Sequence, residues 1–112
     1  MSRRRFDLAM QSMREKDPGV RESAFDFLRE HADAYVEELV GEFTAEQDRE
    51  LRCWLLELVA EARSPKALEV FRGQLESLDE SLRFWAVRGL EMLDSREADQ
   101  ALEQARADGW IA

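Results

Sequence analysis

The segment DESLRFWA occupies residues 79–86, and two related segments precede it, DRELRCWL at residues 48–55 and DPGVRESA at residues 17–24. The three align without a gap, and each begins 31 residues after the one before it. All three share an Asp, a Val or Leu three residues later, an Arg beside it, and an Ala or Leu at the eighth position. A fixed short period is typical of stacked repeat units, so this repeat predicts the architecture of the whole chain.

The period extends along nearly the whole sequence and carries helical spacing. Positions 31 residues apart are mostly apolar: Leu8, Leu39, Val70 and Ala101; Ala9, Val40, Phe71 and Leu102; Phe27, Leu58 and Gly89; Leu28, Val59 and Leu90. In the middle copy Leu51, Leu55 and Val59 follow the spacing of one buried helix face. Each unit is therefore predicted to be two helices. We expect first helices near 5–15, 34–43, 65–77 and 97–107, and second helices near 18–31, 48–62 and 80–93.

Composition agrees with a helical fold. Apolar residues make up 45% of the chain and charged residues 37%, with five Gly and two Pro, whereas Ile and Thr occur once each. Helix formers are thus preferred over strand formers. The 112 residues predict a single domain, residues 1–112, of the all-α class: an α-α superhelix of about three and a half two-helix repeats. Gly109 should end the last helix, and residues 110–111 should fold back as a cap.

The motif Asp-x-x-(Val/Leu)-Arg-x-x-(Ala/Leu) resembles the HEAT-like repeat of short bacterial repeat proteins, including the phycobilisome-lyase type. The period is shorter than the 40–47 residues usual for HEAT units, and Leu55 replaces the Ala of the motif. The resemblance implies that second helices line a concave wall, where such proteins usually bind. It also implies an inter-repeat ladder, in which each Asp caps a helix and each Arg hydrogen-bonds the neighbouring unit's loop. The ladder residues are Asp17, Arg21, Asp48, Arg52, Asp79 and Arg83.

Candidate catalytic and metal-binding residues are few. Cys53 is the only cysteine and His31 the only histidine, which excludes an intramolecular disulfide and a thiolate metal cluster. The repeat places His31 in register with Ala62 and Leu93, which predicts packing rather than catalysis. No Ser or Cys stands beside a base, and there is no Gly-rich phosphate loop. We predict a non-enzyme with no cofactor, no metal and no small-molecule substrate.

The charge of the chain bears on its partner. The formal net charge is −9, which disfavours nucleic acid and anionic membranes as partners. No uncharged run is long enough to span a bilayer, and the basic residues 3–5 are not followed by an apolar signal segment, so we expect a cytoplasmic protein. Residues 21–61 contain twelve acidic residues and four arginines. A neutral or basic protein is the expected partner.

Candidate binding residues lie on the second helices. Asp26 corresponds to Glu57, and Glu30 to Glu61, so four carboxylates should form one patch, either as a solvated surface or as a landing site for a basic partner. Three further candidates are aromatic: Trp54, Trp85 and Phe84. Trp54 and Trp85 share a flanking position and either bind or cement adjacent units. Phe84 should face the concave side, where it is either a partner anchor or a packing residue.

The leading functional hypothesis is a non-enzymatic protein–protein interaction module, an adaptor or inhibitor with an acidic, aromatic-containing concave surface. One alternative is a bacterial immunity protein that neutralises a basic toxin. Another is a structural repeat scaffold without a specific ligand. A chromophore-lyase-like or glycosylase-like HEAT enzyme fits less well, because glycosylases of that type need a basic groove and such lyases generally have more repeats.

Overall fold

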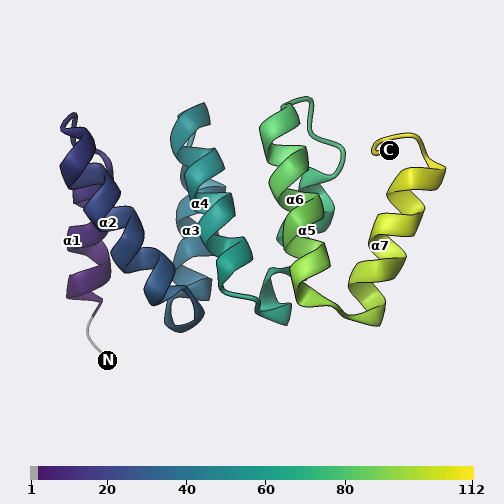
Figure 1. Ribbon diagram of the computed structural model, residues 1–112, viewed down its shortest axis with the longest axis horizontal. Helices are drawn as coiled ribbons and strands as arrows, with labels where there is room; N and C mark the ends of the chain where they lie inside the picture. The colour runs from purple at the N-terminus through teal and green to yellow at the C-terminus, as the bar shows by residue number, and fades with distance from the viewer. Residues whose placement is uncertain (1–2) are drawn as a thin grey trace.

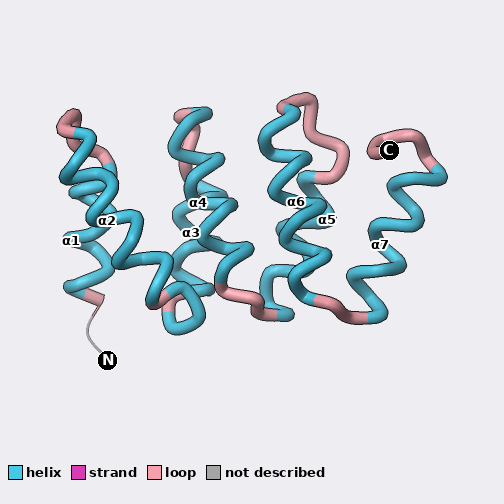
Figure 2. The backbone as a smooth tube through the Cα atoms, viewed as in Figure 1, coloured by secondary structure: helices cyan, strands magenta, loops and turns pink. Residues whose placement is uncertain are grey.

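The computed structural model describes residues 3–112, so the first two residues of the predicted 1–112 domain lie outside the described residues. No strand occurs in this range, and no helix in it has both the length and the apolar composition needed to cross a membrane (Figure 2). The helices are α1 (Arg4–Met13), α2 (Pro18–Glu30), α3 (Val36–Ala45), α4 (Arg49–Glu61), α5 (Leu68–Gln74), α6 (Glu80–Leu93) and α7 (Arg96–Ala107), with short 3-10 helices η1 (Ala32–Ala34) and η2 (Pro65–Ala67).

Successive helix pairs stack side by side along the long axis of a molecule measuring 41 × 28 × 20 Å (Figure 1). In this view α2, α4 and α6 form the front layer, and α1, α3 and α5 lie behind them. Each first helix packs against the second helix of its own unit, and α4 packs along α6. The predicted all-α superhelical solenoid is therefore confirmed.

The repeated aspartates explain where the second helices begin. Asp17, Asp48 and Asp79 each stand in extended conformation directly before α2, α4 and α6. A carboxylate oxygen of each accepts a hydrogen bond from a backbone N–H of the first turn, with a shortest distance of 2.8–2.9 Å in all three cases. Such N-caps stabilise a helix by about 1 kcal/mol each. The starts predicted from the sequence lie within one residue of the observed ones.

The first helices differ more from their predicted bounds. The helix expected over 65–77 is divided into η2 and α5, and it ends at Gln74. The Ser64 hydroxyl accepts from the Lys66 N–H at the start of η2, and Ser77 accepts from the Asp79 N–H in the following loop. Side-chain bonds of this kind compete with a continuing helix, and apolar spacing does not reveal them.

In the core, a larger side chain on one helix of a unit accompanies a smaller residue on the other helix. Two repeat positions, one on the first helix and one on the second, change volume in opposite directions along the chain. The pairs are Ala9 with Phe27, Val40 with Leu58, and Phe71 with Gly89. In the third unit Phe71 is 1% exposed, and its ring lies where a Cβ on Gly89 would be. Gly89 is therefore the small partner that this large side chain requires.

The last helix ends as its sequence predicts. Gly109 adopts φ +82°, a conformation that favours glycine. Its N–H donates to the Arg106 carbonyl at 3.1 Å, and the Trp110 N–H donates to the Ala105 carbonyl at 3.0 Å, which is the Schellman arrangement. Ile111 packs partly against the core, whereas Trp110 is 42% exposed and lines a hollow with Arg72 and Leu75, so the tail turns back toward α5 and does not cover the outer side of α7.

Candidate binding surface

The helices predicted to line a concave wall are α2, α4 and α6, and we call the surface they present the second-helix face (Figure 1). Asp26 and Glu30 lie in the C-terminal half of α2, and Glu57 and Glu61 lie in the C-terminal half of α4. Asp26 pairs with Arg29 of its own helix at 3.3 Å. Glu30 and Glu61 are exposed, whereas Glu57 is half-buried. The four carboxylates thus occupy two adjacent helices in different environments.

Glu57 is the unusual member of this group. Partial burial is the main cause of a raised pKa for its carboxyl group, and the negative charge of Glu61 raises the pKa further, against a smaller opposing effect from Arg29. The Glu57 carboxylate accepts no hydrogen bond and forms no ion pair within residues 3–112. It is a half-buried acceptor that still has its bonding capacity free.

A pocket of about 390 Å³ opens between α2 and α4, and Glu57 forms part of its wall. We call it the α2–α4 pocket; it is lined by Pro18, Arg21, Glu22, Phe25, Trp54 and Glu57. The rings of Phe25 and Trp54 meet edge to face with 6.4 Å between centroids. The Arg21 guanidinium lies 4.2 Å from the centroid of the Trp54 ring. The pocket therefore combines an aromatic wall with two carboxylates, the exposed Glu22 and the half-buried Glu57.

This combination suits a cationic group. A guanidinium or ammonium gains from contact with an aromatic face, by about 0.5–2 kcal/mol depending on its desolvation. The stacking of Arg21 on Trp54 shows that the aromatic wall accepts a cation. A second cation in the pocket would meet the carboxylates of Glu22 and Glu57, which repel an anion.

The aromatic candidates divide into two groups. Trp54 belongs to the α2–α4 pocket and also packs against Phe25 of the preceding unit, so it lines the pocket and cements two units together. Phe84 and Trp85 form a separate pair on α6, edge to face at 5.1 Å between ring centroids. Phe84 is 59% exposed and Trp85 is half-buried. The structure brings Trp54 and Glu57 together but leaves Phe84 and Trp85 outside the pocket lining.

Of the ladder arginines, Arg21 reaches the neighbouring unit. It donates to Glu50 in the first turn of α4 at 2.8 Å. A further link between units joins Arg49 to Asp79. Desolvation is the largest single effect on the pKa of the Asp79 carboxyl group and raises it, but the hydrogen bonds from Arg49 and from the backbone, with the charge of Arg49, together lower the pKa below its ordinary value. Asp79 therefore both caps α6 and joins two units.

For Arg52 and Arg83, the prediction that each ladder arginine hydrogen-bonds the loop of the neighbouring unit is wrong. Arg83 donates to the Ser77 carbonyl at 2.6 Å, in the loop of its own unit. Arg52 stacks on the ring of Phe43, 4.3 Å from its centroid, and its buried Nε has no hydrogen-bond partner within the described range. A planar guanidinium packs flat against an aromatic ring when one lies in reach, and Phe43 on α3 provides that ring.

The two residues with potential for catalysis or metal binding are held in other contacts. His31 Nδ1 lies 2.8 Å from the Phe27 carbonyl, and its ring stacks on the Phe27 ring at 4.4 Å between centroids. Partial burial is the main cause of a raised pKa for the Cys53 thiol, which disfavours the reactive thiolate. Across residues 3–112 no group of three or more His, Cys, Asp and Glu side chains is placed to hold a metal ion.

Sequence reasoning missed Phe25, Glu22 and Pro18 as site residues. Phe25 corresponds to Leu56, which is fully buried, so its position in the repeat indicates core. The pocket exists because α2 is inclined, with its N-terminal half standing away from α4 (Figure 1). The inclination of a helix cannot be predicted from a 31-residue repeat period. The helical spacing does predict that Glu22 faces outward.

Comparison with known proteins gives one family match and no match to a curated protein. A family model described as HEAT repeats matches residues 36–111, which is more than half of the chain.

Proposed function

We propose that this chain, which belongs to the HEAT repeat family, is an adaptor or inhibitor that binds a basic protein through its second-helix face. HEAT repeats are generally protein-interaction or scaffold modules, and the family is typically non-enzymatic. The observation that carries the proposal is the α2–α4 pocket, in which the free, half-buried carboxylate of Glu57 lies beside the aromatic wall of Trp54.

Charge supports a basic partner. Residues 21–61 hold a formal charge of −8 out of a total of −9, and this stretch includes most of α2 and all of α3 and α4. Six of its twelve carboxylates lie on η1, on α3 and in the loop before α4: Asp33, Glu37, Glu38, Glu42, Glu46 and Asp48. A surface of one sign accelerates encounter with a partner of the opposite sign and rejects partners of the same sign. The acidic stretch from α2 to α4 should therefore attract basic proteins before any close contact is made, and the carboxylates of α2 and α4 are the part of it that lies on the second-helix face.

Two anchors are proposed on this face. A Lys or Arg side chain of the partner enters the α2–α4 pocket beside Phe25 and next to Arg21, which already lies over the Trp54 ring, and supplies Glu57 with the hydrogen bond it lacks. An apolar side chain of the partner covers Phe84, whose exposed ring is supported by Trp85. Asp26, Glu30 and Glu61 lie toward the C-terminal ends of α2 and α4, outside the pocket lining, and act as steering charges beside the first anchor.

Affinity capture from extracts of the source organism tests the proposal. The bait is the intact chain, compared with a variant that carries Glu22→Gln and Glu57→Gln, which removes the pocket charges while keeping the side-chain shapes. The control carries Glu97→Gln and Glu103→Gln, the same change in charge on α7. We expect the wild type and the control to capture the same basic protein and the pocket variant to lose it.

Capture that is equal for all three baits would contradict the proposed site, and a captured partner with an acidic surface would contradict the proposed partner class. The activity of the captured protein then separates the two roles. An inhibitor, such as an immunity protein that neutralises a basic toxin, abolishes that activity on binding. An adaptor leaves it intact.

A further inference from the structure

The outer side of the first unit exposes apolar side chains. Leu8 is 52% exposed and Val20 is 41% exposed, on α1 and α2 respectively. They border a hollow of about 700 Å³ that Ala9, Ala24 and the half-buried Phe27 also line. In Figure 1 this side forms the end of the stack, and no helix of the described chain covers it. We call the five residues the N-terminal end face.

The same repeat positions are buried inside the stack. Leu39 corresponds to Leu8 and is fully buried, and Leu51 and Leu82 correspond to Val20 and are 7% and 3% exposed. Leu51 lies beside Met13 and Arg21 of the preceding unit, so this repeat position faces the unit before it. The N-terminal end face thus has the composition of an internal surface between units, but among residues 3–112 it has no unit to meet.

The opposite end of the stack does not complement it. Apart from Ala107, every exposed position of α7 is charged or Gln. Stacking the N-terminal end face of one copy on α7 of another would bury these groups without partners, at a cost that apolar contact does not offset. The surface that best matches the N-terminal end face is a second copy of itself.

We propose that two copies of the chain associate through the N-terminal end face into a closed, two-fold symmetric dimer. An isologous interface, in which both subunits use the same surface, is complete after two subunits and leaves no further copy of that surface exposed. The charges at its borders favour the antiparallel arrangement. Arg5 lies over Phe27, near the start of α1, whereas Asp17 lies in the turn between α1 and α2 at the other end.

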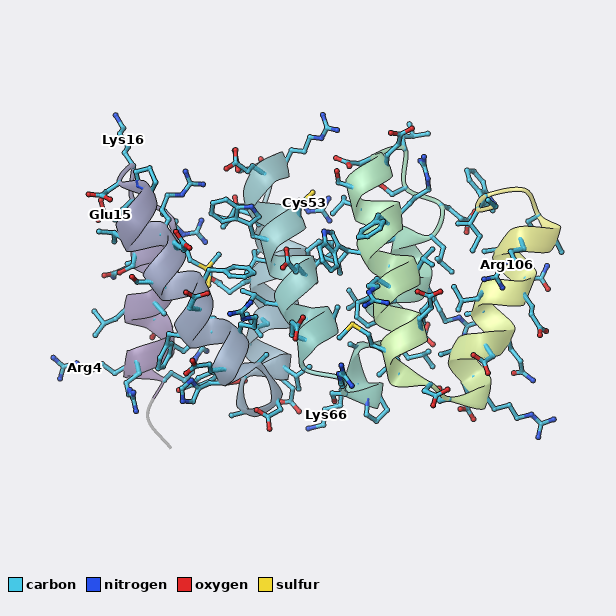
Figure 3. All side chains as sticks on the ribbon, viewed as in Figure 1. Arg4, Glu15, Lys16, Cys53, Lys66 and Arg106 are labelled. Carbon is cyan, nitrogen blue, oxygen red and sulfur yellow. The ribbon has the colours of Figure 1, made fainter. Side chains whose placement is uncertain are left out.

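Figure 3 shows these two ends, with Arg4 at the lower end of α1 and Lys16 at the turn above. When the helices of two copies run antiparallel across the interface, Arg5 of each copy faces Asp17 of the other. The parallel arrangement would instead place Arg5 against Arg5. The dimer uses none of the residues that line the α2–α4 pocket, so it stands independently of the proposed function.

Sedimentation equilibrium of the purified chain over a range of concentrations tests the dimer. We expect the wild type to be dimeric and the variants Leu8→Glu and Val20→Glu to raise the dissociation constant by about tenfold or more, because a carboxylate would be buried at the interface. Both positions are exposed in the single chain, so circular dichroism should show unchanged helix content. The control is Leu78→Glu, which changes a leucine that is 93% exposed in the loop before α6 and should leave the dimer intact.

A second variant tests the arrangement. Arg5→Glu should weaken an antiparallel dimer by roughly threefold to tenfold at low salt, since it places a carboxylate opposite Asp17 at each of the two symmetric contacts. A chain that is monomeric at every concentration overturns the proposal, as does a dimer that survives Leu8→Glu and Val20→Glu. Growth into larger assemblies overturns the closed two-fold interface. An unchanged or strengthened dimer with Arg5→Glu overturns the antiparallel arrangement.

Discussion

At the scale of single residues, we expect the ionised Glu57 carboxylate to lower the stability of the fold. It is half-buried and unpaired, and it stands in the C-terminal half of α4, one turn before the negatively charged Glu61. Its raised pKa means that the folded chain holds this proton more tightly than the unfolded chain does. Stability contributed by Glu57 is therefore present below its ordinary pKa and is lost as pH rises through the raised value.

Glu57→Gln should consequently increase the free energy of unfolding at neutral pH, by an amount of a few tenths of a kilocalorie, because the residue is partly exposed and solvent screens the effect. The advantage over wild type should shrink as pH falls below the ordinary Glu pKa of about 4.3. Urea unfolding of both proteins at neutral and acidic pH measures it, with the exposed Glu103→Gln as control. A Glu57→Gln protein that is less stable than wild type at neutral pH would show that Glu57 is a structural residue and not a free acceptor.

Arg52→Ala tests the corrected reading of the ladder. Since Arg52 makes no side-chain hydrogen bond within residues 3–112, the loss should come from stacking and stem packing against Phe43, and we expect about 0.5–2 kcal/mol. Arg52→Met keeps much of the packing and should recover part of that loss, as seen in the denaturant midpoint. If Arg52 instead acts through hydrogen bonds, Arg52→Met and Arg52→Ala should unfold at the same denaturant midpoint.

At the scale of elements, the second helices could be predicted well and the first helices less so. The starts of α4 and α6 follow from an Asp cap and apolar spacing, both of which are local signals. The end of α5 depends on bonds within the following loop, including that from Arg83 to the Ser77 carbonyl, and its position cannot be read from spacing. The pocket depends on the inclination of α2 against α4, which is a property of packing between elements. The sequence therefore predicted Glu57 as one of four candidate carboxylates, but not the pocket that Glu57 lines.

The compensation between Phe71 and Gly89 gives a prediction for a helix pair. Gly89→Ala should destabilise α6 against α5, because overpacking costs about 1–3 kcal/mol and exceeds the gain of about 1 kcal/mol in helix propensity. The double variant Phe71→Val, Gly89→Leu recreates the residues of the second unit, Val40 and Leu58. It should be more stable than the sum of its two single variants by at least about 1 kcal/mol.

The control for this pair is Gly41→Ala on α3, where a Cβ would meet no atom within 4 Å. It should stabilise by up to about 1 kcal/mol through helix propensity alone. Thermal or urea unfolding of the set decides the matter. If the changes in the free energy of unfolding caused by Phe71→Val and Gly89→Leu were additive, the proposal that the two side chains fill the same space in the core would be contradicted.

At the scale of the whole molecule, the solenoid holds two separate surfaces. The α2–α4 pocket and the N-terminal end face share no residue, so a dimer would present two copies of the second-helix face. Two linked copies raise the avidity for a partner that carries two basic sites. That residues 1–112 fold as one domain stays a prediction, which a single cooperative unfolding transition would support.

The association rate with the captured basic partner, measured at low and high salt, tests the steering role of the second-helix face most directly. The comparison is between the wild type and a variant that changes Asp26 to Asn and Glu30, Glu57 and Glu61 to Gln. Steering predicts that the variant associates about tenfold more slowly at low salt and that its rate depends less on salt, with helix content unchanged. Equal association rates and equal salt dependence in the two proteins would contradict the account and move the binding site away from α2 and α4.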